Sequence, residues 1–348
     1  MDKPAIGGIP LFAGLGQGEL GDIVRIFERV TFEPGACLVR QGHPADSAFI
    51  LESGAADVIT ALPGGGEAKV AQLGPGSVLG EMALLESGVR SATVIASSAL
   101  AGHFIERDSF RMLLAQRNQA AFAIQGRIIR TLCQRLRELN AKIVSYDLPG
   151  NAAPAIEEQG GKRAPARGRA SFDWRAFLPV LPVFRRFSVV EIAEFADMAE
   201  AMEAGRGQAL FRQGEASGAC YIVVRGAIEI TGARNGRRHR IGILGPGKLC
   251  GILALIEGQP HSMSAIVRER ATLLEIGKAA FDRLLSGKGR VSARFQDAIN
   301  QELLQALART NNHLTRLISQ ARIRDGLLKK NDVAELQRAL GAQDCRAA

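Results

Sequence analysis

The chain contains VRQGHPADSAFILESG at residues 39–54, and FRQGEASGACYIVVRG repeats its pattern at residues 211–226. Both copies place Arg-Gln-Gly before a segment rich in aliphatic residues and end that segment with glycine. Leu-Gly-Pro-Gly follows each copy, at residues 73–76 and 244–247. Glycines between short segments rich in Ile, Val and Leu are typical of turns between β-strands. Because the period is far longer than that of a solenoid, the sequence predicts two copies of a whole all-β domain.

Helical patterns flank both predicted rolls, a short one before each and a longer one after it. The predicted fold class is therefore mainly β with flanking helices: two jelly-roll-like β-rolls, each followed by a long helix. Apolar residues recur in both trailing helices at steps of three and four, as in a coiled-coil seam. The seam residues are Ile129, Leu132, Leu136, Leu139 and Ile143 in the first helix, and Leu303, Leu307, Thr310, Leu314, Leu317 and Ala321 in the second. Two interpretations stay open for each seam: packing on its own roll, or pairing in a homodimer, which the longer second seam favours.

The segment between the copies, residues 149–171, is rich in Ala, Gly, Pro and charge and has a single large aliphatic residue. Such a segment cannot bury enough apolar surface to order itself, so we expect a flexible linker. The predicted domains are residues 9–148 and 172–290, and a helical, coiled-coil-like segment is expected at residues 291–340.

The composition, with 47% hydrophobic and 23% charged residues in a chain of 348, is that of an ordinary soluble globular protein. No apolar run approaches the roughly 18 residues of a membrane span, and the N-terminus lacks a signal-peptide pattern, so we expect a cytoplasmic protein. The five cysteines are scattered without a Cys-x-x-Cys pair, which predicts neither a zinc site nor disulfides. The five histidines are dispersed too, and no phosphate loop occurs, so we do not expect an enzyme.

The net charge of +9 is unevenly distributed along the chain. Residues 1–148 hold 14 Lys and Arg against 15 Asp and Glu, whereas the remainder holds 30 against 20. A basic excess of this kind is found in proteins that bind nucleic acid. It is also common on an ordinary solvated surface, which is the interpretation we adopt, so nucleic acid is not an expected partner.

Residues 79–94, LGEMALLESGVRSATV, carry the strongest chemical signal. We expect a glycine-led turn into a one-turn helix at residues 81–85, then a short loop, with Arg90 opening the next strand. Backbone N–H groups of Met82 and Ala83 at the start of that helix would suit a cyclic phosphate. Arg90 would add a full positive charge and a planar pair of donors.

The acidic residue of this segment, Glu81, can only accept hydrogen bonds when ionised, so its natural partner is a hydroxyl such as a ribose 2′-OH. Small side chains around it leave room for a ligand to approach the backbone closely. These small residues are Gly80, Ala83, Ser91 and Ala92.

This segment resembles the phosphate-binding cassette of the cyclic-nucleotide-binding domain family. The family includes bacterial catabolite activator proteins, the regulatory subunits of cAMP-dependent kinase and cyclic-nucleotide-gated channels. Its pattern of Gly-Glu, apolar residues, a short loop, Arg and small residues is met here by Gly80, Glu81, Met82, Ala83, Leu84, Arg90, Ser91 and Ala92. The resemblance covers residues 9–145 and 181–320.

The resemblance implies that Glu81 takes the ribose 2′-OH, that Arg90 takes the phosphate, and that Ser91 donates a further hydrogen bond. The trailing helix would close over the base with residues between positions 131 and 136. The wall beside the nucleotide would be formed by Val58, Val70 and Ala71. The alternative is a domain without a ligand, in which Glu81 and Arg90 only pair with each other.

The second copy departs from the pattern, because Ile252 stands in the place of Glu81 and His261 in the place of Arg90. Isoleucine cannot accept a hydroxyl proton, and a histidine with a pKa near 6.5 is mostly neutral at pH 7. We expect a degenerate, ligand-free second domain. The alternative is an altered site to which an arginine from elsewhere supplies the charge, the candidates being Arg212, Arg225 and Arg268.

These features predict a cyclic-nucleotide receptor, in which ligand binding at the first copy moves the trailing helix and the second copy transmits the change. The expected ligand is cAMP, with cGMP as the second choice, and the expected partners are a second copy of the chain or an unknown protein effector. Regulatory subunits of cAMP-dependent kinase also carry two such domains. Their inhibitory basic segment precedes both domains, and nothing of that type stands before Ile9, so we do not expect direct kinase inhibition.

Two other classes of function stay open. A DNA-binding regulator of the catabolite-activator type would carry a helix-turn-helix after the trailing helix. The tail begins like such a motif but ends at Ala348 before a recognition helix, which argues against this class. A scaffold whose rolls only present helices for assembly would bind no cyclic nucleotide.

Overall fold

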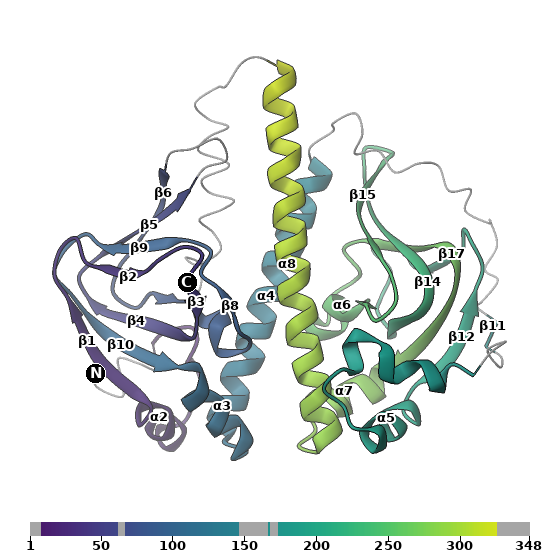
Figure 1. Ribbon diagram of the computed structural model, residues 1–348, viewed down its shortest axis with the longest axis horizontal. Helices are drawn as coiled ribbons and strands as arrows, with labels where there is room; N and C mark the ends of the chain where they lie inside the picture. Colours follow the sequence, from purple (N-terminus) through teal and green to yellow (C-terminus); the bar gives the residue numbers. More distant parts are fainter. Residues whose placement is uncertain (1–7, 62–66, 146–165, 168–172, 326–348) are drawn as a thin grey trace. The chain divides into compact units, whose positions relative to one another are not determined.

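The computed structural model describes residues 8–61, 67–145, 166–167 and 173–325 (Figure 1). The chain divides into two compact units: the first comprises Met1–Leu132 together with the chain from Arg322 onward, and the second comprises Cys133–Ala321. Helix α4, Gln119–Ser145, begins in the first unit and ends in the second. The boundary between the units therefore falls inside the predicted domain 9–148.

The first unit is an antiparallel β-roll made of two four-stranded sheets and one two-stranded sheet. The strand order is β1-β10-β4-β7 in one sheet, β2-β9-β5-β6 in the second and β3-β8 in the third. The strands are β1 Phe27–Phe32, β2 Cys37–Val39, β3 Pro44–Ala45, β4 Ser47–Ser53, β5 Ala56–Ala61, β6 Glu67–Leu73, β7 Val78–Leu79, β8 Gly88–Val89, β9 Thr93–Ala96 and β10 Leu100–Glu106. The helices before, within and after the roll are α2 Gln17–Val24, η1 Glu81–Leu84, α3 Arg107–Ala115 and α4.

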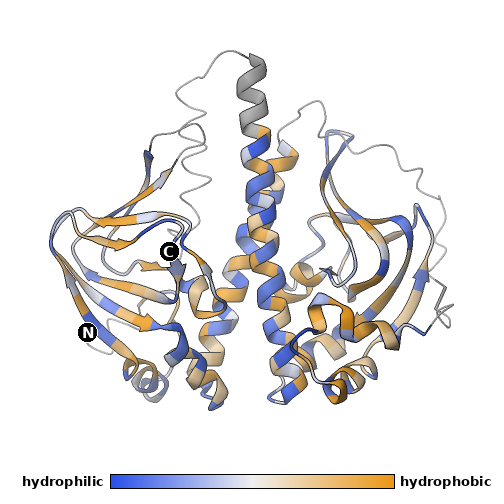
Figure 2. Cartoon of the chain, in the orientation of Figure 1, coloured by the Kyte–Doolittle hydropathy of each residue, from blue (hydrophilic) through white to orange (hydrophobic). Residues whose placement is uncertain are grey.

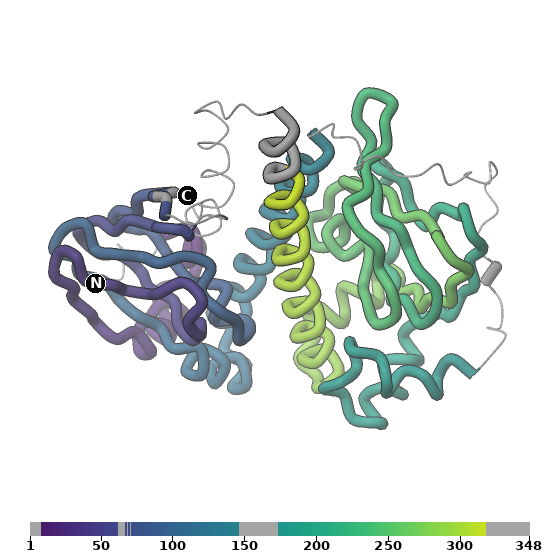
Figure 3. The backbone as a smooth tube through the Cα atoms, turned by 45° about the horizontal axis from the view of Figure 1, so that its top comes forward, coloured from purple at the N-terminus to yellow at the C-terminus, as the bar shows by residue number. Residues whose placement is uncertain are grey.

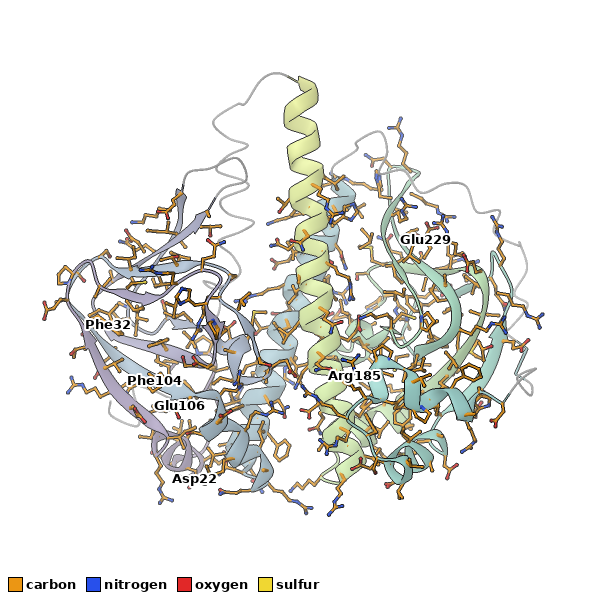
Figure 4. The ribbon with its side chains drawn as sticks, viewed as in Figure 1. Asp22, Phe32, Phe104, Glu106, Arg185 and Glu229 are labelled. Atoms are coloured by element: carbon orange, nitrogen blue, oxygen red, sulfur yellow. The ribbon has the colours of Figure 1, made fainter. Side chains whose placement is uncertain are left out.

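The interior of the first roll is apolar because alternate residues of its strands face inward. Strand β5 shows this pattern, with Ala56 and Val58 buried and the residues between them less so. Phenylalanines from three strands meet at the core: the ring centroids of Phe32 and Phe49 are 6.3 Å apart, and those of Phe49 and Phe104 are 5.7 Å apart (Figure 4). Hydrophobic residues recur along the strands of both rolls (Figure 2).

The second unit contains an antiparallel sheet with the strand order β11-β12-β17-β14-β15, in which β13 pairs with β17 and β16 pairs with β14. Strands β14 and β15 form a long hairpin (Figure 3). The strands are β11 Ala166–Arg167, β12 Glu200–Ala204, β13 Ala209–Phe211, β14 Ala219–Arg234, β15 Arg237–Leu244, β16 Leu249–Cys250 and β17 Ser264–Gly277. The helices are η2 Arg175–Val180, η3 Pro182–Phe184, α5 Val189–Ala196, α6 Ile252–Glu257, α7 Lys278–Ser286 and α8 Arg290–Asp325.

Repeated residues of the two copies make the same contacts. The backbone N–H of Gln41 donates to Thr93 Oγ1 over 3.1 Å, and that of Gln213 donates to Ser264 Oγ over 3.0 Å. Gly54 and Gly226 both have positive φ, +82° and +91°, and a Cβ on either would lie within 2.4 Å of a backbone oxygen. The glycine after each aliphatic strand is therefore required by both conformation and space. These paired contacts confirm the two β-rolls predicted from the repeat.

The segment predicted to be a flexible linker, residues 149–171, includes a short strand. Residues 166–167 form β11, which pairs antiparallel with Glu203 and Met202 of β12. The rest of that segment lies outside the described residues, as do residues 326–340 of the predicted C-terminal helical segment. Helix α8 accounts for the part of that segment that is described.

The seam side chains of both trailing helices are buried in the single chain wherever the structure describes them. Relative exposure is 0% for Leu132 and Ile143 in α4, and 0% for Leu303 and 2% for Leu314 in α8. The side chain of Ala321 lies outside the described part. Burial within one chain agrees with the first interpretation, packing on the chain's own fold, and pairing of the seams in a homodimer stays a prediction. None of the described helices has the length and apolar character needed to cross a bilayer.

Candidate functional site

The guanidinium of Arg90 is buried and held by the start of strand β4. The Arg90 side chain is 7% exposed, its Nη1 atom donates to the backbone oxygen of Ser47 over 2.8 Å, and its Nη2 atom donates to Ser47 Oγ over 2.8 Å. The carboxylate of Asp46 lies 3.6 Å from Nη2 and accepts from Ser47 Oγ over 3.0 Å. Arg90 follows β8 and precedes β9, which begins at Thr93, so it does not open the strand as predicted. The arrangement places a fixed positive charge inside the roll.

Gly80 makes room for this guanidinium. Its φ of +74° lies in the left-handed region, and a Cβ there would lie 2.3 Å from Arg90 Nη1 and 2.9 Å from the Ser47 oxygen. An L side chain at this position would clash with both the cation and the backbone that holds it. The predicted small residue is therefore required by the position of Arg90.

Glu81 is the first residue of the one-turn 3-10 helix η1, and it is 3% exposed. A carboxylate inside a roll is costly unless it accepts hydrogen bonds, and a hydroxyl is a suitable donor. The prediction that the Ala83 N–H faces an anion is wrong, because it donates to the Gly80 oxygen over 2.9 Å and closes the turn. Met82, whose oxygen accepts from the Leu85 N–H over 3.1 Å, belongs to the same turn.

The described residues of the predicted wall belong to the apolar core beside the cassette, and their role toward a nucleotide stays a prediction. Val58 and Ala71 are paired across β5 and β6, and Val58 also pairs with Val94 of β9. Val58 and Ala92 are buried members of one core cluster, and Ala71 packs against it. The side chain of Val70 lies outside the described part, and Ser91 is exposed. In the predicted closing stretch, residues 131–136, the boundary between the two units follows Leu132.

The second cassette is filled by an aromatic pair. His261 is 6% exposed and stacks on Phe211, with ring centroids 3.8 Å apart and planes inclined by 9°. A Cβ on Gly251, the counterpart of Gly80, would approach the Phe211 ring to 3.4 Å. Burial lowers the pKa of His261, Glu215 opposes that change and Arg137 adds to it, so the imidazole is neutral at pH 7. The position that holds a guanidinium in the first copy therefore holds uncharged rings in the second.

The residues that hold Arg90 are absent from the second copy as well. Gly218 and Ala219 stand where Asp46 and Ser47 stand, by alignment of the Arg-Gln-Gly repeats. The second copy thus lacks both the arginine and the residues that would hold it. This joint loss is the signal that could have identified Ser47 from the sequence. Sequence reasoning also missed Phe211, which replaces the smaller Val39.

Two of the three arginines considered as replacements face carboxylates. Arg268 Nη1 lies 3.1 Å from Glu229, which is fully buried and lies in β14 (Figure 4). Arg212 Nη1 lies 4.0 Å from Glu215, to which the Arg212 backbone N–H also donates. Arg225, the third, lies in β14 and is exposed.

Comparison with known proteins places this site in a family. The family described as the cyclic nucleotide-binding domain matches residues 29–117 and 202–288. The cAMP-dependent protein kinase regulatory subunit of Mycosarcoma maydis is 26% identical over 300 residues, 81% of this chain and 48% of that protein. The CRP-like cAMP-activated global transcriptional regulator of Mycobacterium tuberculosis is 25% identical over 149 residues, 42% of this chain and 65% of that protein.

Among solved structures, the regulatory domain of Toxoplasma gondii PKA with cAMP is 22% identical, with a TM-score of 0.31, over 84% of this chain and 92% of that one. The chain spans about half the length of the kinase regulatory subunits it matches. The two matched segments together make up just over half of the chain and coincide with the two β-rolls. The chain therefore belongs to the cyclic nucleotide-binding domain family.

Proposed function

We propose that the chain is a cyclic-nucleotide receptor, not an enzyme, with one binding site per chain, in the first domain. Arg90 binds the cyclic phosphate, Glu81 accepts the ribose hydroxyl, and the apolar wall at Val58 and Ala71 lies beside the nucleoside. The observation that supports this most directly is the pair of hydrogen bonds from the buried Arg90 guanidinium to Ser47.

That geometry suits an anion for a physical reason. A buried cation is costly unless it is hydrogen-bonded, and the Ser47 contacts meet that need while fixing the plane of the guanidinium. A phosphate arriving at a fixed charge in a low-dielectric site gains strong charge-assisted hydrogen bonds without further ordering of the protein. The second cassette offers none of these groups, since rings of His261 and Phe211 stack there. The second domain is therefore proposed to bind no cyclic nucleotide and to transmit the response to a protein effector.

The proposed nucleotide is cAMP. The related proteins from Mycosarcoma maydis and Mycobacterium tuberculosis are named as cAMP-dependent and cAMP-activated, and they align with 81% and 42% of this chain. The site itself recognises features that cAMP and cGMP share, namely the cyclic phosphate and the ribose hydroxyl. The preference for adenine over guanine is therefore measured by comparing the affinities for cAMP and cGMP.

The test is calorimetric titration of the purified chain, stripped of bound nucleotide, with cAMP and separately with cGMP. We expect one site per chain and tighter binding of cAMP. Arg90→Ala should weaken binding at least tenfold, because removing one partner of a buried charged pair costs about 2–5 kcal/mol. His261→Ala is the matched control at the equivalent position and should leave the affinity unchanged. The absence of binding heat with both nucleotides, or two equal sites, would contradict the proposal.

A further inference from the structure

The end of helix α4 is attached to the second cassette by one side chain. Arg137, in the part of α4 that belongs to the second unit, donates from Nε and Nη2 to Glu257 Oε2 over 2.9 and 2.5 Å. Its Nη1 atom donates to the backbone oxygen of Pro260 over 3.2 Å. Glu257 is the last residue of α6, and Pro260 immediately precedes His261. We call these three residues the Arg137 clasp.

The clasp is a shielded contact and therefore differs from an ordinary surface ion pair. The Glu257 side chain is 8% exposed and that of Arg137 is 29% exposed. Cys133, one turn before Arg137, is fully buried, and its thiol pKa is raised to about 12, first by burial and second by the charge of Glu257. A carboxylate in such a place is strongly destabilising without its cation, so each partner depends on the other.

A second contact holds the same helix further along. A Cβ on Gly232 of β14 would lie 2.4 Å from Val144 Cγ2, so the end of α4 lies directly against that strand. Gly232 is the residue that permits this close approach. The second domain thus receives α4 at two places seven residues apart in the helix.

The second cassette also has a different shape from the first at the clasp. In the first copy the short helix η1 ends at Leu84, and Glu86, the counterpart of Glu257, lies beyond its C-cap. In the second copy α6 extends to Glu257 and ends at Gly258, whose φ of +63° is a left-handed cap. A carboxylate in the last turn of a helix is unfavourable next to the exposed carbonyl groups, whereas a cation there is favourable. The extension of α6 to Glu257 therefore makes a nearby cation such as Arg137 stabilising.

We propose that the second cassette has become a binding site for the end of α4, and that the Arg137 clasp carries the state of the first pocket into the second domain. The first cassette presents a guanidinium to an anionic ligand, whereas the second presents a carboxylate and a carbonyl to a guanidinium of its own chain. Helix α4 is continuous from Gln119 to Ser145, so a displacement near its start moves Arg137 relative to Glu257 or carries α6 with it. The second part of this proposal rests on the proposed function of the first pocket.

The attachment itself is tested without nucleotide, in the full-length chain, by a double-mutant cycle of Arg137→Ala and Glu257→Gln. The measured quantity is the equilibrium constant for denaturant unfolding of the second domain, with Arg137→Lys as a variant that keeps the charge. We expect the two effects to be coupled by roughly tenfold, because the residues share one shielded contact. The charge swap Arg137→Glu with Glu257→Arg should recover part of the loss. Additive effects in the cycle would overturn the assignment of a binding site for α4.

Transmission is tested by hydrogen exchange of the same proteins with and without saturating cAMP. In the unsubstituted chain, cAMP should change the exchange rates of α6 amides at least threefold. In Arg137→Ala that change should disappear, while the calorimetric affinity of the first pocket stays within about threefold, since neither clasp residue belongs to that pocket. A response of α6 that persists in Arg137→Ala overturns the transmission route. If the unsubstituted chain binds no cyclic nucleotide, both the proposed receptor function and the proposed transmission are overturned. The proposed attachment of α4 to the second cassette is then still decided by the double-mutant cycle of unfolding.

Discussion

The hydroxyl of Ser47 joins Arg90 to Asp46: it accepts from Arg90 Nη2 over 2.8 Å and donates to Asp46 Oδ1 over 3.0 Å. Because Arg90 lies 43 residues from Ser47 in the sequence, the orientation of the guanidinium depends on a contact between the loop after β8 and the start of β4. The Ser47 backbone oxygen holds the other end of the same guanidinium. The hydroxyl contacts Nη2 whereas the backbone oxygen contacts Nη1, so a substitution of the Ser47 side chain removes the first contact and keeps the second.

Ser47→Ala should weaken cyclic-nucleotide binding by about three- to tenfold while leaving the stoichiometry at one. One hydrogen bond to a charged group contributes about 1.5–3 kcal/mol, and the loss in binding is smaller than this because the backbone contact to Arg90 survives. Calorimetric titration measures the change. Ser87→Ala, on the exposed cassette loop, is the matched control and should bind normally. Equal affinities for Ser47→Ala and the unsubstituted chain would show that the hydroxyl does not position Arg90.

Gly80→Ala should both destabilise the first domain and weaken binding. The new Cβ would meet Arg90 Nη1 and the Ser47 oxygen, and the backbone would stay in a strained left-handed conformation, at a cost of about 1–3 kcal/mol. Gly18→Ala is the control and should stabilise the first domain. Gly18 lies in α2, and a Cβ there would meet no atom within 4 Å. Alanine is more favourable than glycine in a helix by up to ~1 kcal/mol. Denaturant unfolding of both variants checks the prediction, which a neutral Gly80→Ala would refute.

The pH dependence of stability should carry a signature of His261. Burial lowers its pKa in the folded chain below the unfolded value, so the unfolded state takes up the proton first as the pH falls. Its contribution is therefore complete above about pH 6.5 and is lost as the pH falls below that value. His103 and His313 have pKa values lowered by burial too, and they act in the same direction. Unfolding free energies between pH 5 and 8 should fall less steeply on the acid side in His261→Gln than in the unsubstituted chain.

Restoring the missing cation alone should not restore a second site. His261→Arg would place a guanidinium against Phe211, where Gly218 and Ala219 provide neither the carboxylate nor the hydroxyl found in the first copy. An uncompensated buried charge costs several kcal/mol, so we expect a lower melting temperature and still one nucleotide per chain. Calorimetry and thermal unfolding measure the two quantities. Binding of a second nucleotide by this variant would show that the second cassette has lost little more than its arginine.

The sequence was sufficient to predict what depends on local pattern. The repeated glycines predicted both rolls, because Gly54 and Gly226 are required wherever this turn occurs. The cassette was located from the spacing of Glu81 and Arg90, whose burial the structure now describes. The proposed roles of these residues toward a ligand remain predictions.

Contacts between segments distant in the sequence could not be predicted in the same way. The holder of Arg90 lies at the start of β4, and nothing local distinguishes Ser47 from any serine before a strand. The stacking of Phe211 on His261 joins residues 50 positions apart. The orientation of the Ala83 N–H depended on whether the turn was 3-10 or α, which the composition of four residues does not determine.

Helix α4 also bears on how this protein can be divided for experiment. A fragment that stops after the first roll and its helix would display Arg137 and Val144 without Glu257 and Gly232, which cover them in the whole chain. A fragment that starts at the second roll would expose the carboxylate of Glu257 and the open face of Gly232. The boundary between the sequence repeats and the boundary between the packed units thus fall at different places, and a truncation at the first cuts through the second unit.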